Sequence, residues 1–166
     1  MPATANTNGI LYADLTFQSS LNNQVKALFA YGCSSSAFSL SNLVSNQGVV
    51  ATDTTGVGTA RMSLAAAGYG GDKAIFGYGT STFSDRLSMT NLVSNQGVVA
   101  TDTTGVGTIR SSLAAAGYGG DKAIFGYGSA AGYTLVTITN TVSNTGVVNS
   151  DVTNAGTTAR SGLAAA

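Results

Sequence analysis

Residues Asn42 to Gly79 read NLVSNQGVVATDTTGVGTARMSLAAAGYGGDKAIFGYG, and the same 38 positions return from Asn91 to Gly128 almost unchanged. A duplication of this length and fidelity is the signature of a repeat architecture, in which one structural unit is stacked several times along the chain. The two copies differ at only two positions, which are Ala60 against Ile109 and Met62 against Ser111.

Diverged copies of the same stretch lie on both sides of this pair. KALFAYG at residues 26–32 resembles its end, and residues 140–166 resemble its beginning. The period is 49 residues, because Asn42, Asn91 and Asn140 are evenly spaced by that number. We therefore predict an arm over residues 1–9 and a repeat domain over 10–166. Its units are expected at about 10–55, 62–104 and 111–153, followed by an orphan strand at 161–166.

Turn formers divide each unit into four short runs rich in β-branched, aromatic or small residues. In the second unit these runs are SLAAAGYG, KAIFGYG, LSMTNLVSN and VVATDT. This pattern predicts an all-β protein in which each unit is a sheet of four short antiparallel strands. The glycines Gly70 and Gly119 begin tight hairpin turns, where we expect a positive φ. A helix at SLAAA is the alternative, but so short a run cannot nucleate one before GYGG.

Composition excludes several classes of function. Only 8% of residues are charged, and seven Asp are balanced by seven Lys plus Arg, so no basic face is available for nucleic acid. No apolar run reaches the roughly 18 residues that span a bilayer, so membrane insertion is not expected. The chain has no His and no Glu, which excludes a Ser-His-Asp triad and His-ligated metals. We expect no enzyme activity, no cofactor and no metal.

Most charged residues recur with the repeat. We interpret them as structural, satisfying turn groups or bridging neighbouring units, with ligand contact as the alternative. The repeat-equivalent aspartates are expected on successive units, too far apart for the close carboxylate pair of a glycosidase. These positions are Arg61, Arg110, Arg160, Asp53, Asp102 and Asp151.

Three loops break the repeat, because their sequences differ from unit to unit. They follow each FAYG or FGYG and read CSSSAFS, TSTFSDR and SAAGY. Loops that differ in sequence on otherwise similar strands are the positions where contacts to a partner would differ between units. The only cysteine lies in the first loop, and we expect it to be a small buried apolar residue. The candidate contact residues are Cys33, Phe38, Phe83, Asp85, Arg86 and Tyr133.

The repeat resembles the kelch family of β-propeller proteins. In that family an Arg precedes a small-residue strand, and a short turn leads to a second strand that ends in glycines. Here Arg61, SLAAAGYG, GDK and AIFGYG occupy these positions, although GYG replaces the glycine doublet and the chain has no Trp. The resemblance implies that each unit is a four-stranded propeller blade, and counting strands along the sequence gives three complete units and one orphan strand. A stacked β repeat in an oligomeric fibre is the alternative architecture.

The amino-acid sequence of the repeat is also similar to that of kelch-like virion and tail-fibre proteins of tailed bacteriophages, particularly marine and cyanobacterial ones. That resemblance implies a non-enzymatic structural or host-attachment component of a phage particle, assembled in the host cytoplasm. Its expected partners are other virion proteins, copies of itself or a host surface glycan. The alternative function is a binding module of a bacterial surface protein.

Overall fold

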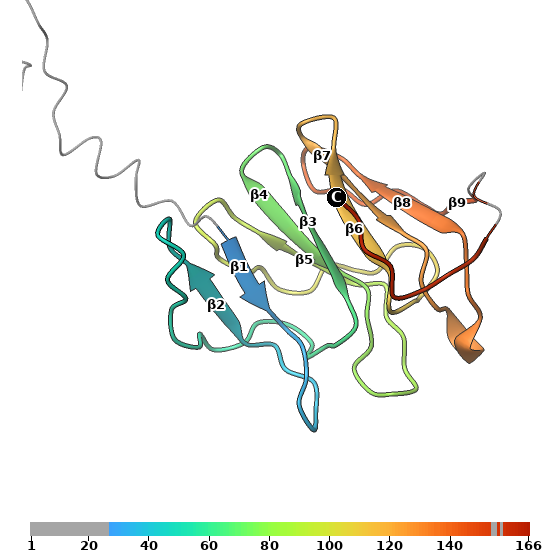
Figure 1. Cartoon of the computed structure of the whole chain (residues 1–166), viewed down its shortest axis with the longest axis horizontal. Helices are drawn as coiled ribbons and strands as arrows, with labels where there is room; N and C mark the ends of the chain where they lie inside the picture. The colour runs from blue at the N-terminus through green and yellow to red at the C-terminus, as the bar shows by residue number, and fades with distance from the viewer. Residues whose placement is uncertain (1–26, 154–155, 157) are drawn as a thin grey trace, which may run out of the picture.

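The computed structural model describes residues 27–153, 156 and 158–166, and these residues form β-strands with almost no helix. The prediction of an all-β protein is therefore confirmed. Three antiparallel sheets follow one another along the described chain (Figure 1). They consist of β1 (Ala27–Ala30) and β2 (Ser41–Val44); β3 (Ala65–Tyr69), β4 (Lys73–Gly77) and β5 (Thr90–Val93); and β6 (Ala114–Tyr118), β7 (Lys122–Gly126), β8 (Ile138–Val142) and β9 (Val152–Thr153).

Each sheet is a meander in which consecutive strands pair, and the register repeats with the sequence. In the second sheet Ala65 lies opposite Gly77, and in the third Ala114 lies opposite Gly126, 49 residues later. Three residues connect β3 to β4, beginning with Gly70 at φ +62°, and Gly119 has the same φ in the third sheet. The expected positive φ at both turns is confirmed. Only glycine adopts it without a steric penalty.

The fourth strand of each unit is shorter than predicted. In the first two units it is reduced to single bridges, such as Val50 to Val44 and Thr54 to Ser41, and only the third unit forms β9. An asparagine side chain explains the interruption. The Nδ2 of Asn42 donates to the carbonyl of Ala51 at 3.1 Å, so a side chain takes an acceptor that a continuous ladder would use.

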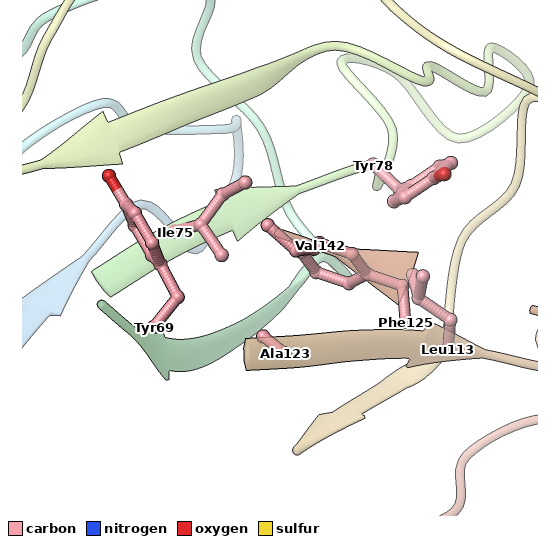
Figure 2. Packing of buried hydrophobic residues seen from close by; sticks show 7 residues of the cluster. All are labelled: Tyr69, Ile75, Tyr78, Leu113, Ala123, Phe125 and Val142. Atoms are coloured by element: carbon pink, nitrogen blue, oxygen red, sulfur yellow. The ribbon is translucent and has the colours of Figure 1, made fainter. Parts of the chain in front are cut away.

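The described core lies between the second and third sheets. Ile75 and Tyr78 on the second sheet face Phe125 and Val142 on the third, and all four side chains are buried (Figure 2). The rings of Tyr78 and Phe125 meet edge to face, with centroids 5.2 Å apart. The innermost strands contain alanine and glycine, and a Cβ at Gly117 would lie 3.4 Å from the carbonyl oxygen of Gly68. Small residues thus let β3 and β6 approach each other.

Two features of the predicted architecture are not formed in the described residues. The three sheets lie side by side without closing into a ring. The orphan strand expected at 161–166 is also not a strand, since those residues have no ladder partner among the described residues. In the other units this run pairs with the hairpin strand that follows LAAA, and the described residues provide no such strand for 161–166. The predicted arm and the first strand of the first unit lie outside the described residues.

The described part of the chain contains no helix that is long and apolar enough to cross a membrane.

Candidate functional site

An arginine stacked on a tyrosine connects each unit to the segment that follows it. The guanidinium carbon of Arg61 lies 4.8 Å from the ring centroid of Tyr31, and that of Arg110 lies 4.2 Å from Tyr78. A third stack repeats the arrangement at 4.3 Å and joins Arg160 to Tyr127. Each tyrosine holds a positive φ, between 63° and 66°, which turns its ring toward the arginine. The same local geometry is thus built three times.

Arg61 and Arg110 extend from one unit into the next and are fully buried. The Nη1 of Arg61 donates to the carbonyl of Met89 at 2.8 Å, and its Nη2 donates to Oδ1 of Asn91. The Nη2 of Arg110 donates to Oδ1 of Asn140 at 2.5 Å. Burial of the guanidinium lowers the pKa of Arg110 from its usual value. Arginine side chains are not deprotonated in proteins, so both arginines act as charged clamps between units.

An aspartate completes each clamp. Asp102 accepts a hydrogen bond from Nδ2 of Asn91 at 2.9 Å, and its other oxygen accepts from the amide and hydroxyl of Thr59 at 2.9 and 2.7 Å. Burial by itself raises the pKa of the Asp102 carboxyl, but the bonds from Thr59 and Asn91 outweigh it and lower that pKa overall. Asp102 is therefore an ionised acceptor. It lies near the end of the second unit and connects that unit to Thr59, which precedes it in the chain.

Asp151 repeats this arrangement one period later. Its Oδ2 accepts from the amide and hydroxyl of Thr108 at 3.0 and 2.6 Å, and its Oδ1 accepts from Asn140 at 2.9 Å. The Nη1 of Arg110 lies 3.9 Å from the same Oδ1. Again burial opposes ionisation, while the hydrogen bonds from Thr108 and Asn140 lower the pKa of the carboxyl overall. Asp53 in the first unit keeps the bond from Asn42, at 2.8 Å.

The glycines of TTGVGT make room for these aspartates. A Cβ at Gly58, which has φ +74°, would lie 2.3 Å from Oδ1 of Asp102. A Cβ at Gly107, at φ +73°, would lie 2.1 Å from Oδ1 of Asp151. Both positions thus require glycine for conformation and for space. The motif is a turn that receives a carboxylate of the next unit.

The hairpin turns form a second repeated feature, at the opposite edge of the sheets from the variable loops (Figure 1). Lys73 forms an exposed ion pair with Asp72 at 2.7 Å, and Lys122 pairs with Asp121 at 2.8 Å. The lysine bond lowers the pKa of the Asp72 carboxyl. Between the two turns lies an open hollow of about 310 Å³, lined by glycines and by these lysines. Its cations are already paired, so the hollow offers no unpaired charge to a ligand.

The three variable loops gather along one edge of the molecule, below the strands in the view of Figure 1. Phe83 and Tyr133 are largely exposed there, and Phe38 is partly exposed. Cys33 is exposed too, so the expectation of a buried cysteine is wrong. The reason is local: Cys33 pairs with Ala37 in a narrow loop whose residues 33–36 are all exposed, while contact with the rest of the chain is made further along, where Phe38 bridges to Arg61. We call the residues 33–39, 80–86 and 129–135 the loop edge.

Arg86 supports the loop edge from within. It is buried, and its Nε donates to the carbonyl of Ser129 at 3.0 Å, while its guanidinium lies 4.6 Å from the ring centroid of Tyr133. Asp85 remains in its own loop, where it accepts from the hydroxyl of Ser81 at 3.3 Å. Arg86 therefore holds two neighbouring loops together, and the exposed aromatic rings are the groups left for a partner.

The predicted site residues thus separate into two sets that do different things. Of the charged residues named from the repeat, four bond between units: Arg61, Arg110, Asp102 and Asp151. Asp53 and Arg160 are exposed at the two ends of the described array. Among the described residues no three His, Cys, Asp or Glu side chains come close enough to hold a metal ion. Sequence reasoning missed the role of the asparagines, which it used only to measure the period. The constant separation of 11 residues between each Asn and its Asp was the available signal.

The chain matches no protein-family model and no curated protein.

Proposed function

We propose that the chain is a non-enzymatic structural or attachment component of a bacteriophage particle, built from kelch-like blades and contacting its partner through the loop edge. The observation that carries this proposal is the division of labour between repeated and unrepeated residues. Repeated charged side chains bond to neighbouring units, whereas the unrepeated loops expose aromatic rings. A binding surface that varies on a fixed scaffold is the usual arrangement in binding repeats.

The chemistry of the loop edge suits protein or glycan contact. Phe83 and Tyr133 present flat rings with little conformational entropy to lose, and aromatic residues of this kind are enriched in binding hot spots. Arg86 fixes the second ring by stacking beneath it. Around the rings lie serine and threonine hydroxyls of the same loops, which can bond to sugar hydroxyls or to backbone groups.

Placement in a phage particle is supported by the similarity of the repeat to phage kelch-like virion proteins, together with its low charge. A binding module of a bacterial surface protein is the second candidate, because the same loop edge would serve adhesion. Mass spectrometry of purified particles separates the two. Stoichiometric peptides from this chain are the expected result, and their absence from infectious particles would refute the virion role.

The role of the loop edge is tested with particles that carry variant chains. Phe83→Ser combined with Tyr133→Ser should lower the adsorption rate to host cells by at least tenfold, because the substitutions remove both exposed rings. Val98→Ser is the matched control, since Val98 is also exposed but lies away from the loop edge. Equal adsorption by the double variant and the control would show that the loop edge does not make the contact.

A further inference from the structure

The first sheet exposes a face that is buried in the other two units. Phe29 is 63% exposed, whereas the repeat-equivalent Phe76 and Phe125 are 6% and 0% exposed. Inside the chain each such phenylalanine packs on the tyrosine of the preceding unit, as Phe76 does on Tyr31 with centroids 5.4 Å apart. Among the described residues, Phe29 therefore presents the same apolar contact without the tyrosine that covers its equivalents.

Polar groups on the same face show the same difference. Asn91 and Asn140 are fully buried under an arginine, but Asn42 is half-buried, and within the described part of the chain its side chain bonds to groups of its own unit. Asp102 and Asp151 each accept two bonds from a preceding threonine, and the described residues place no such threonine against Asp53. We call Phe29, Asn42 and Asp53 the leading face.

The third unit exposes the complementary set. Tyr118 is 43% exposed, whereas its equivalent Tyr69 is 4% exposed and reaches Gly146 of the next unit. Arg160 stacks on Tyr127 like the other arginines, yet it is exposed, and its guanidinium donates to the carbonyl of the nearby Thr158 at 3.4 Å rather than to an asparagine of another described unit. We call Tyr118, Tyr127, Thr158 and Arg160 the trailing face.

We propose that the trailing face of one copy of this chain binds the leading face of a second copy, reproducing the contact that joins consecutive units inside the chain. The pairs follow from the repeat alone. Phe29 would pack on Tyr127 as Phe125 packs on Tyr78. Arg160 would donate to Asn42 as Arg110 donates to Asn140, and Thr158 would donate to Asp53 as Thr108 donates to Asp151. The cation and the carboxylate are on opposite faces, so the charges are complementary.

A contact between two different faces is heterologous, so it repeats from copy to copy. It closes into a ring if the rotation per copy allows, and it otherwise grows into a filament. The inference does not depend on the loop edge, since neither face includes a residue of those loops. It rests on the exposure differences between residues that have nearly the same sequence around them.

The first experiment measures mass in solution by sedimentation over a range of protein concentrations. The wild-type chain should associate as concentration rises, and Phe29→Ser should weaken association by at least tenfold. Phe83→Ser is the matched control, because it removes an exposed phenylalanine from outside both faces and should leave association unchanged. A wild-type chain that remains monomeric throughout would overturn the proposal, and so would equal weakening by the two variants.

The second experiment tests the head-to-tail direction by mixing two variants. Phe29→Ser removes the leading face and Arg160→Ala removes the trailing face, so each variant alone should be monomeric at concentrations where the wild type associates. A mixture retains one intact face from each variant and should form dimers that grow no further. Thr158→Val can replace Arg160→Ala if that variant melts below the wild type. A mixture that stays monomeric, or single variants that associate like the wild type, would refute the proposal.

Discussion

Arginine truncation at two equivalent positions should have very different effects on stability. Arg110 and Arg160 both stack on a tyrosine, at 4.2 and 4.3 Å. They differ in what lies on their other side. Arg110 is fully buried against the third unit, and Arg160 is exposed. Comparing Arg110→Ala with Arg160→Ala therefore isolates the contribution of the following unit.

The expected magnitude comes from the contacts of Arg110. Its removal leaves Oδ1 of Asn140 without its charged donor and takes a desolvated cation from the ring of Tyr78. Breaking one partner of a buried charged pair typically costs about 3–5 kcal/mol. For the exposed stack of Arg160 the corresponding loss is about 0.5–1 kcal/mol. In a chain of this size about 3–5 kcal/mol corresponds to a fall in Tm on the order of 10 °C.

Urea unfolding followed by far-ultraviolet circular dichroism measures both variants. The samples are kept at concentrations where sedimentation shows a monomer, so that Arg160 is not covered by a second copy. Arg110→Met serves as a further control, because it fills the space without the charge or the hydrogen bonds. Equal losses for Arg110→Ala and Arg160→Ala in the monomer would show that the tyrosine stack alone, and not the neighbouring unit, stabilises these arginines.

Three further outcomes are expected. Gly70→Val and Gly119→Val should each lower the free energy of unfolding by about 1–2 kcal/mol or more through αL strain. The loss should be larger for Gly70→Val, because a Cβ there would lie 3.0 Å from a carbonyl oxygen of the third unit. Equal Tm values for wild type and both variants would refute the turn geometry. Burial raises the pKa of Tyr78 to about 12, so stability should fall as pH rises from about 10 toward 12, and a Tyr78→Phe variant that shows the same alkaline loss in urea unfolding would contradict this. The pKa of the Asp151 carboxyl is lowered overall, because the hydrogen bonds from Thr108 and Asn140 outweigh the effect of burial. The contribution of Asp151 to stability should therefore be complete above about pH 4 and be lost at lower pH. Asp151→Asn should make the free energy of unfolding less dependent on pH in the acid range, and an unchanged dependence would count against the clamp.

Local features of the fold could be predicted because they depend on residues close together in the chain. Strand pairing across GGD follows from alternation and from a turn that needs glycine, and the structure has both. The length of the fourth strand could not be predicted. That length is limited by an asparagine side chain of the neighbouring strand, which bonds to a carbonyl of the fourth strand in place of the backbone. The sequence of the fourth strand itself does not indicate this bond.

Contacts between units were harder to read from the sequence than contacts within them. The repeat showed that Arg61 and Asp102 recur, but their meeting with Asn91 and Thr59 involves separations of 30 and 43 residues. Cys33 was predicted to be buried from the usual behaviour of the residue type, whereas the loop that contains it projects from the sheets. Whether a loop packs against another segment is a tertiary property, and no local pattern determines it.

Even the two differences between the near-identical copies follow this division between scaffold and loop edge. Met62 and Ser111 are both buried, and each forms a bridge to the residue that begins a variable loop, Thr80 in one unit and Ser129 in the next. Since Arg86 also donates to the carbonyl of Ser129, the third loop is held by the position that changed and by the second loop together. The other difference, Ile109 for Ala60, lies just before the arginine and is exposed. The one buried change in the repeat therefore lies where the strands support loops of unlike sequence, which is expected if the loops are the part of the molecule that distinguishes one unit from another.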